Sequence, residues 1–404
     1  MISLKVNINL PASKSISNRV LIIQSICEEK FEIENLSQAN DTILLQGILS
    51  TIQETTETQT IYVEDAGTPF RFLTAYLSTL ENKSFFLSGT ERLNERPIAP
   101  LVDALNDLGA EILYAKNYGL PPLSIKGKLV ESKKINIDSA ESSQFISALC
   151  LIAPTLKEGI IITINENTVS ASYIDMTLSV MQDFGIEYQK TKNEIIIPSQ
   201  KYIAKKYSIE NDWSSACFFY AMAMIADDVE ITLEGLQMKS SQGDAFITVL
   251  CQAFGIDTTF ENNHCIIRKK NATNCSLSII DLKNYPDLAI PFIVACAIKH
   301  PSVKIIGIAH LIHKESNRIE ALQNELQKVN IFIHYENDIL SFDNKMTANK
   351  PQEIFFNSYN DHRIVMALNL FSLLGYTLHF DNKFCVKKSF PQYWEEVEKL
   401  HVAK

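Results

Sequence analysis

Basic side chains recur in this sequence beside the starts of apolar segments. Lys14 and Arg19 surround one such start, and Arg71 and Arg363 belong to two others. A guanidinium can donate two parallel hydrogen bonds to a carboxylate or phosphate, whereas lysine supplies a compact positive charge. The start of a helix also attracts anions, because its first N–H groups lack intrahelical partners and its dipole is positive there. The pattern therefore predicts binding of phosphate and carboxylate groups.

Each of these residues also has an ordinary structural explanation. A basic residue near a helix start can be a solvated surface residue, Asp287 can be a helix N-cap, and His362 can be a buried core histidine. Lys314 and Arg318 are four residues apart, which predicts that they share one face of a helix. The functional interpretation depends on the clusters occurring together and in order.

The apolar segments recur at a nearly constant spacing, which indicates an internal repeat. Six of them open near residues 17, 67, 142, 214, 287 and 361, and the last five openings are 72 to 75 residues apart. A second series consists of amphipathic segments, each of which ends at a residue suited to a left-handed helix C-cap. These residues are 70 to 76 positions apart: Gly109, Gly185, Gly255 and Asn330. We interpret this as about six copies of a unit of α and β structure, three in each of two domains. The alternative is coincidence in a chain that simply alternates helix and strand.

Composition limits the possible classes of protein. The chain has 404 residues, enough for two domains, and its net charge of −10 argues against nucleic-acid and anionic-membrane partners. No signal peptide is evident, and the longest apolar stretches are too short to span a membrane. Eight scattered cysteines without a CxxC pair favour reduced thiols in a cytoplasmic protein. Cys265 and Cys275, ten residues apart beside His264, are the only cysteine pair whose spacing suggests a metal site, and we expect none there.

Motifs along nearly the whole chain, from Leu10 to about Leu400, resemble those of the 3-phosphoshikimate 1-carboxyvinyltransferase family, also called 5-enolpyruvylshikimate-3-phosphate (EPSP) synthases. They follow in the family's order: LPASKSISNR from Leu10, DAGT from Asp65, ERPI from Glu95, SSQF from Ser142, YIDMT from Tyr173, YPD from Tyr285, KES from Lys314, NDHR from Asn360 and KSFP from Lys388. So many motifs in register make the resemblance specific.

The resemblance implies an α/β fold of two similar lobes, each built from three βαβαββ repeats as an inside-out α/β barrel. Residues 13–210 would form the lobe that carries much of the shikimate 3-phosphate site. Residues 1–12 and 211–404 would form the second lobe, with the active site in the cleft between the two. The second lobe would carry Asp287, Lys314, Arg318, Arg363 and Lys388.

The family's reaction transfers the enolpyruvyl group of phosphoenolpyruvate (PEP) to the 5-hydroxyl of shikimate 3-phosphate, releasing phosphate, in chorismate and aromatic amino acid biosynthesis. By resemblance, Asp287 would be the base, with Glu315 and Lys14 as proton-transfer partners. Shikimate 3-phosphate would contact Lys14, Ser15, Arg19, Ser142, Ser143, Gln144, Ser170, Tyr173, Asp287, His310 and Lys314. PEP would contact Lys14, Gly67, Arg96, Gln144, Arg318, Arg363 and Lys388. Neither a metal nor an organic cofactor is expected, and we expect a monomer.

Other functions remain open at this point. The sister transferase that acts on UDP-N-acetylglucosamine shares the fold and the donor, but its loop normally carries a catalytic Cys or Asp. A catalytically silent anion-binding homologue and a structural repeat scaffold are two further classes. The chain also departs from the family pattern, with Asp65 where Asn is commoner, Pro69 where Ala is usual, Asn317 where Asp is usual, and His310 where Asn is frequent.

Overall fold

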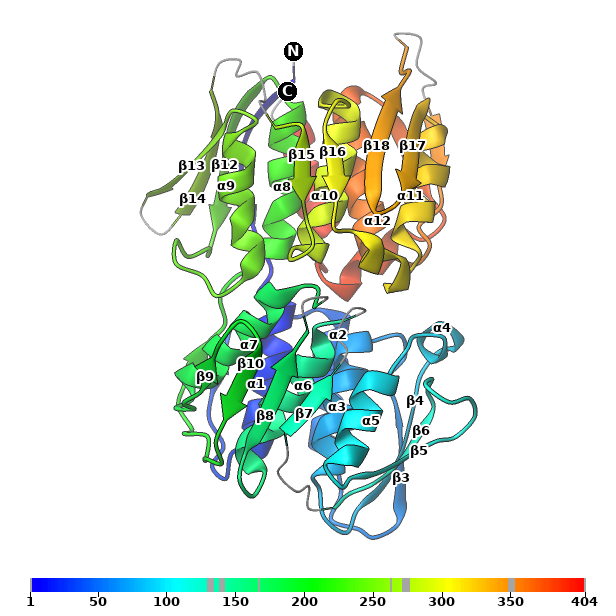
Figure 1. The fold of residues 1–404 in the computed structure, drawn as a ribbon. Coiled ribbons are helices and arrows are strands. Elements are labelled where there is room, and N and C mark those ends of the chain that lie inside the picture. Colours follow the sequence, from blue (N-terminus) through cyan, green and yellow to red (C-terminus); the bar gives the residue numbers. More distant parts are fainter. Residues whose placement is uncertain are drawn as a thin grey trace. The chain divides into compact units, whose positions relative to one another are not determined.

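The computed structural model describes residues 2–128, 134–137, 142–165, 168–261, 264–270, 277–347 and 353–402. The chain divides into two compact units (Figure 1). The continuous unit comprises Lys14–Ile209, and the split unit comprises Met1–Ser13 together with Glu210–Lys404. None of the helices in the described ranges has the length and apolar character that crossing a membrane requires.

The continuous unit alternates helices with short strands. Its helices are α1 (Lys14–Ile26), α2 (Asn40–Thr51), α3 (Gly67–Ser78), α4 (Glu91–Asn94), α5 (Ala99–Asp107), α6 (Gln144–Ile152), the 3-10 helix η1 (Ala153–Thr155) and α7 (Ala171–Asp183). Its strands are β2 (Ile33–Glu34), β3 (Thr58–Tyr62), β4 (Ser84–Ser88), β5 (Glu111–Tyr114), β6 (Leu123–Lys126), β7 (Lys134–Ile137), β8 (Ile160–Ile164), β9 (Gln189–Lys190), β10 (Glu194–Ile197) and β11 (Tyr207–Ser208).

Two four-stranded sheets of the continuous unit share one design. Their strand orders are β3-β4-β6-β5 and β7-β8-β10-β9. In each sheet the first two strands are parallel and the others are antiparallel. Parallel neighbours need a crossover connection, which α3 and α6 supply. Each sheet and its helices therefore form one βαβαββ repeat, and β11 pairs in parallel with β2 in a third, smaller sheet.

The split unit repeats the design with strands from distant parts of the chain. Its helices are α8 (Trp213–Ile225), η2 (Gly243–Phe246), α9 (Ile247–Gln252), α10 (Pro286–Lys299), η3 (Ala309–His313), α11 (Arg318–Gln327), α12 (His362–Leu368), η4 (Asn369–Leu374), η5 (Lys383–Lys388) and α13 (Tyr393–Val402). Its strands are β1 (Ser3–Asn9), β12 (Asp228–Glu234), β13 (Ile256–Glu261), β14 (His264–Lys269), β15 (Ile279–Asp281), β16 (Lys304–Ile306), β17 (Ile331–Glu336), β18 (Ile339–Asn344), β19 (Glu353–Phe356) and β20 (Thr377–Phe380).

The sheets of the split unit have the orders β1-β12-β14-β13, β15-β16-β18-β17 and β19-β20. The N-terminal strand β1 pairs in parallel with β12, so Ser3 lies opposite Asp228. The first strand of this repeat thus comes from the beginning of the chain, and the rest follows residue 210.

The core of each unit consists of three packed helices: α1, α3 and α6 in the continuous unit, and α8, α10 and α12 in the split unit. They coincide with the six apolar segments of the sequence, and every residue of α8 is buried. Each large apolar side chain buried in this way contributes about 1.5–3 kcal/mol. The predicted left-handed helix ends are confirmed, because the φ angles of Gly109, Gly185, Gly255 and Asn330 are 99°, 85°, 76° and 59°.

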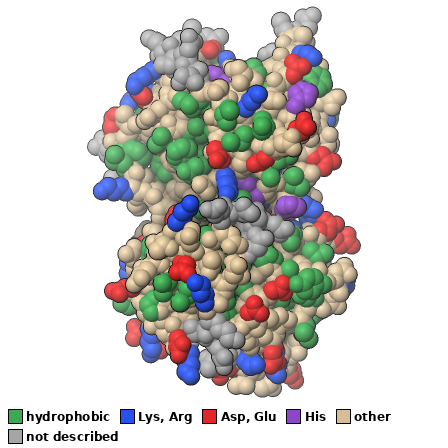
Figure 2. All heavy atoms as spheres, viewed as in Figure 1, with side chains coloured by type: hydrophobic (Ala, Val, Ile, Leu, Met, Phe, Trp, Pro, Cys, Tyr) green, Lys and Arg blue, Asp and Glu red, His purple; other side chains and the backbone are tan. Residues whose placement is uncertain are grey.

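Charged side chains are distributed over the surface of the protein. On the face shown in Figure 2, acidic and basic side chains are interspersed over each unit rather than gathered in one large basic patch. The basic residues singled out in the sequence have a different environment, because Arg19, Arg71, Arg96, Arg318 and Arg363 are all buried.

Candidate functional site

The start of α3 brings two arginines of the continuous unit together. Arg71 lies one turn into the helix, and its Nη1 donates to the Gly67 carbonyl at 3.3 Å and to Gln144 Oε1 at 2.9 Å. A Cβ atom on Gly67 would lie 2.4 Å from Nη1 of Arg96 and 2.9 Å from Nη1 of Arg71. Glycine is therefore required at this position for both guanidinium groups to approach the helix start.

Arg96 is a buried arginine whose guanidinium could bind an anionic ligand. It is 7% exposed, and its Nε has no hydrogen-bond partner among the described residues. A buried cation costs free energy unless it is paired. The N-cap residue of α3, Ala66, moreover supplies no side-chain cap to the first N–H groups of the helix. A guanidinium and free helix N–H groups in one place are suited to a carboxylate or phosphate.

Gln144 connects the starts of α3 and α6. Its Nε2 donates to Thr68 Oγ1 at 2.9 Å, and its backbone N–H donates to Ser142 Oγ at 3.2 Å. The Ser143 side chain makes no capping bond to α6, although Ser143 occupies the N-cap position. The structure therefore brings Gly67, Arg96 and Gln144 into one cluster and adds Arg71, which the sequence analysis had not assigned to a ligand.

The start of α1 presents Lys14 next to a carboxylate. Lys14 Nζ lies 3.2 Å from Asp41 Oδ2, and the two side chains are 14% and 5% exposed. Ser15 follows, and its carbonyl accepts a hydrogen bond from Arg19 Nη1 at 2.8 Å. Asp41, which the sequence analysis missed, thus holds the lysine in a largely buried ion pair.

Arg19 is enclosed within the continuous unit. Its Nε donates to Thr177 Oγ1 at 2.8 Å, its Nη2 donates to the Tyr173 carbonyl at 3.1 Å, and the guanidinium lies 5.4 Å from the centre of the Phe72 ring. Burial lowers the pKa of Arg19 to about 10, so it remains a cation at neutral pH. Nearby, Ser170 is left-handed at φ 57° before α7, and its buried Oγ has no partner in the described chain.

In the split unit, Asp287 lies in the first turn of α10 and contacts Arg363 twice. Arg363 Nη2 is 2.8 Å from the Asp287 carboxylate, and Nη1 donates to the Asp287 carbonyl at 3.2 Å. The helix contains Pro291, four residues after Asp287. Because proline has no N–H, it cannot donate to the carbonyl of residue i−4. Pro291 thus leaves that carbonyl to Arg363, which binds Asp287 through both backbone and side chain.

Arg318 is the centre of an ion cluster and is only 1% exposed. It contacts Asp361 through Nε at 2.8 Å and Glu315 through Nη2 at 2.8 Å, and its Nη1 lies 3.8 Å from Asp287. Burial alone would lower the pKa of Arg318, but Asp361 and Glu315 raise it above its usual value. Asp361 also caps α12 by accepting from the Arg363 N–H at 3.0 Å. One buried carboxylate therefore holds the Arg318 guanidinium and fixes the backbone at Arg363.

The prediction that Lys314 and Arg318 share a helix face is wrong. The helix α11 begins at Arg318, while Lys314 is extended with φ −89° and ψ −157°. The helix starts late because Asn317 caps it, accepting from the Glu320 N–H at 3.3 Å. Asn and Asp are equally good caps, so the departure at Asn317 preserves the helix start.

His310 and Lys388 are buried in the split unit, on η3 and η5. Burial, followed by the charges of Lys314 and Arg318, lowers the pKa of His310 to about 3. Its imidazole is therefore neutral at pH 7, and Nε2 has no partner among the described residues. A neutral imidazole facing cations can serve as a hydrogen-bonding group for a ligand rather than as a charge.

Asp244, on η2, is a buried carboxyl group that the sequence analysis missed, because nothing in the local pattern distinguishes it. Ser214 Oγ donates a short hydrogen bond to it. Burial, and then the charge of Asp287, raise the pKa of Asp244 from its ordinary 3.8 to about 7. The folded state therefore binds this proton more tightly than the unfolded state does, and the stability of the split unit should fall as pH rises from about 4 through 7.

We expect Asp244→Asn to raise the free energy of unfolding of the split unit at pH 8, by on the order of 1–3 kcal/mol. At pH 4 the difference from wild type should nearly vanish, because Asp244 is already protonated in the folded wild type. Urea titrations followed by tryptophan fluorescence measure this, since Trp213 and Trp394, the only two tryptophans, both belong to the split unit. An equal difference at both pH values would contradict the raised pKa.

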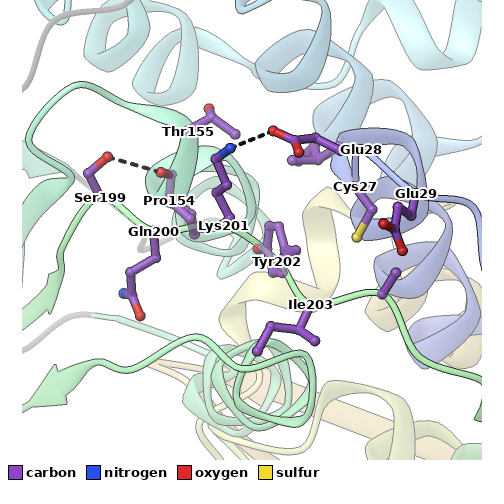
Figure 3. Close-up of a pocket in the computed structure, with 12 residues that line it drawn as sticks. Cys27, Glu28, Glu29, Pro154, Thr155, Ser199, Gln200, Lys201, Tyr202 and Ile203 are labelled. Carbon is purple, nitrogen blue, oxygen red and sulfur yellow. Dashed lines mark hydrogen bonds and ion pairs between the residues drawn. The ribbon is translucent and has the colours of Figure 1, made fainter.

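A separate cavity of about 660 Å³ lies at the other end of α1 (Figure 3). Its lining includes Cys27, Glu28 and Tyr202, and Lys201 pairs with Glu28 at 2.7 Å. The 13-residue helix places it about 20 Å from Lys14. Helix C-termini carry partial negative charge, and two glutamates lie beside this one, so the cavity does not suit a phosphate.

Metal ligation finds no support in the described ranges. They contain no group of three or more His, Cys, Asp or Glu residues placed to hold a metal ion. Cys265 is buried in β14, where its Sγ contacts the Tyr220 hydroxyl at 3.6 Å. Cys275, its suggested partner, lies outside the described residues.

Comparison with known proteins supports the fold inferred from the repeats. The EPSP synthase of Acinetobacter baumannii superimposes with a TM-score of 0.75 at 20% identity, covering 98% of this chain and 96% of that chain. The enolpyruvyl transferase NikO of Streptomyces tendae gives a TM-score of 0.72 at 12% identity, covering 99% and 95%. The predicted fold class, an α/β protein of two similar lobes, is confirmed.

Sequence comparison identifies the family. A 3-phosphoshikimate 1-carboxyvinyltransferase of Bacteroides fragilis (strain YCH46) is 37% identical over 398 residues, covering 98% of this chain and 95% of the relative. The same-named protein of Buchnera aphidicola subsp. Cinara cedri is 34% identical over 417 residues, covering 96% and 93%. The family model described as EPSP synthase (3-phosphoshikimate 1-carboxyvinyltransferase) matches residues 2–397. With so complete a match, the chain belongs to the EPSP synthase family.

Proposed function

We propose that the arginine clusters described above hold PEP during the reaction of this family. The chain is a transferase that moves the enolpyruvyl group of PEP to shikimate 3-phosphate, a step of aromatic amino acid biosynthesis. The observation that carries the PEP assignment is the buried Arg96 guanidinium, whose Nε lacks a partner among the described residues, beside the start of α3. Gly67, Gln144 and Lys14 would complete this part of the site, and Arg318, Arg363 and Lys388 would serve PEP from the split unit.

Shikimate 3-phosphate is assigned to a second set of side chains. Ser170, whose buried Oγ has no described partner, and neutral His310 are suited to hydrogen bonding with its hydroxyls or phosphate. Lys14 and Lys314 supply positive charge. In full, the proposed contacts are Lys14, Ser15, Arg19, Ser142, Ser143, Gln144, Ser170 and Tyr173 in the continuous unit, and Asp287, His310 and Lys314 in the split unit.

The proposed chemistry is addition followed by elimination. The 5-hydroxyl of shikimate 3-phosphate attacks C2 of PEP while C3 gains a proton, which gives a tetrahedral ketal phosphate. Phosphate then leaves as C3 loses a proton. Asp287 would accept the hydroxyl proton, and Glu315 and Lys14 would transfer protons at C3. The arginines would stabilise the charge on the departing phosphate.

We further propose that the protein acts as a monomer in the cytoplasm. The seven described cysteines are all free thiols, six of them buried, which suits a reducing compartment. The acceptor is shikimate 3-phosphate rather than UDP-N-acetylglucosamine, in agreement with the family and with the names of the relatives. Sedimentation at micromolar concentration would test the oligomeric state.

Gly67→Ala tests the PEP assignment. The new methyl group would occupy the space of the Arg96 guanidinium and displace it from the helix start. Loss of one charge-assisted hydrogen bond, worth about 1.5–3 kcal/mol, should raise the KM for PEP about 10- to 100-fold. The KM for shikimate 3-phosphate should change little. Steady-state phosphate release, with each substrate varied in turn, gives both constants.

The chain offers a matched control for this substitution. Gly47 lies within α2, and a Cβ there would meet nothing within 4 Å. Gly47→Ala should therefore leave both KM values at their wild-type level and slightly stabilise the helix. A wild-type KM for PEP in Gly67→Ala would show that PEP binds elsewhere.

A further inference from the structure

Glu325 is a buried carboxylate on α11 that the proposed chemistry does not use. Its side chain is 0% exposed. Oε2 accepts hydrogen bonds from the Asn357 N–H at 2.9 Å and from Lys328 Nζ at 2.6 Å, and Oε1 accepts from the Tyr359 hydroxyl at 2.9 Å and from Asn357 Nδ2 at 3.2 Å. Three of these four bonds bind the segment that connects β19 to α12.

The backbone of this connecting segment adopts an unfavourable conformation, which contacts from other residues must stabilise. Tyr359 and Asn360 are consecutive left-handed residues with φ of 54° and 51°. The left-handed conformation is unfavourable for residues other than glycine. Two such residues in succession therefore persist only where surrounding contacts fix them. Glu325 supplies these contacts on one side, and Asp381 accepts from the Ser358 N–H at 2.7 Å on the other.

The segment ends at Asp361, the carboxylate that pairs with the Arg318 guanidinium and accepts from the Arg363 N–H. Arg318, its main partner, is seven residues before Glu325 on the same helix. Seven residues are close to two helical turns, so the two side chains project from one face of α11. One face of α11 therefore holds both ends of the segment. Glu325 binds Asn357 and Tyr359, and Arg318 binds Asp361.

We infer that Glu325 is a positioning residue for PEP binding: by fixing the segment from Asn357 to Asn360, it sets the position of Asp361 and, through it, of Arg318 and Arg363. The inference rests on the proposed assignment of these two arginines to PEP. Burying the Glu325 carboxylate carries a desolvation cost, and its four hydrogen bonds offset that cost.

Glu325→Gln tests the inference with little change in shape. The amide can replace only one acceptor oxygen, so its NH2 group faces a donor of Asn357 in either orientation, together with Lys328 or the Tyr359 hydroxyl. We expect the KM for PEP to rise about 5- to 20-fold while the KM for shikimate 3-phosphate stays within about twofold. This is less than the roughly 10- to 100-fold cost of a lost hydrogen bond to a charged group, because Glu325 acts on the arginines only through the segment. Tyr359→Phe removes one donor and should shift the KM for PEP in the same direction by less, even if Glu325→Gln folds poorly.

Glu396 provides the matched control. It is also a buried glutamate of the split unit, and it accepts from a backbone N–H (Asn9, 2.9 Å) and from the lysine three residues later (Lys399, 2.6 Å). Glu396→Gln should lower the urea midpoint as Glu325→Gln does but leave the KM for PEP unchanged. If Glu325→Gln and Tyr359→Phe likewise lower only the midpoint, the positioning role is overturned.

Arg363→Met separates failure of this inference from failure of the PEP assignment. A raised KM for PEP in Arg363→Met, together with wild-type values in Glu325→Gln and Tyr359→Phe, would overturn the inference alone. A wild-type KM in Arg363→Met would overturn the assignment of that arginine and the inference with it.

Discussion

Asp287→Ala is expected to lower kcat about 10²- to 10⁴-fold, the range typical of a lost general base. The KM for PEP should not rise, because Arg363 and Arg318 lose a competing carboxylate at 2.8 and 3.8 Å and keep their own positive charge for the ligand. Phosphate release from PEP, measured with saturating shikimate 3-phosphate, separates the two effects. A fall in kcat with an unchanged or lower KM identifies a group that acts in the transition state.

Asp343→Ala is a suitable control, because this aspartate belongs to the same unit and forms a half-exposed ion pair with Lys345 at 2.7 Å. It should retain wild-type kinetics. Near-normal kcat in Asp287→Ala would exclude Asp287 as the base. Phosphate release by the wild type that depends on UDP-N-acetylglucosamine instead would contradict shikimate 3-phosphate as the acceptor.

Arg318→Met is expected to give the largest loss of stability, about 3–5 kcal/mol in the split unit. Asp361 is 0% exposed, and together with Glu315 and Asp287 it would face the space that the guanidinium now occupies. Buried carboxylates that lose their cation repel one another and lack water to screen them. Urea unfolding followed by tryptophan fluorescence again reports on this unit alone, because both tryptophans belong to it.

The double variant Arg318→Met/Asp361→Ala makes this test specific. Removing one of the three carboxylates should recover part of the loss, with a coupling free energy of about 0.5–3 kcal/mol between the two positions. Arg268→Met serves as the control, since Arg268 pairs with Glu230 and Glu261 at the surface of the same unit and should cost no more than about 1 kcal/mol. Strictly additive effects of the two substitutions would contradict the buried cluster.

The parts of the fold that depend on local sequence were predictable. A helix that is apolar all round must be buried, so the six central helices could be found from their composition. Gly109, Gly185, Gly255 and Asn330 could be assigned as helix ends, because glycine and asparagine adopt the left-handed conformation most readily. The regular spacing of both features then indicated the repeat and the fold class.

Features that depend on contacts distant in sequence were not predictable in the same way. A spacing of four residues predicts that Lys314 and Arg318 share a helix face, but Asn317 caps α11 and starts the helix only at Arg318. Asp244 and Glu325 look like ordinary surface acids in the sequence, and only tertiary packing buries them. The role of Pro291 is evident only once Arg363, 72 residues later in the chain, is seen to donate to the Asp287 carbonyl.

The pairing of β1 with β12 has a consequence for how the protein is made. Strand β1 leaves the ribosome before the continuous unit, yet its partner residues lie 225 positions later in the chain. At about 5–20 residues per second, β1 waits roughly 10–45 s for β12 to be synthesised. The continuous unit has all of its strands by residue 209 and can fold during this interval. The split unit is therefore completed last, and its unpaired first strand is the segment most exposed to wrong partners while the chain is being translated.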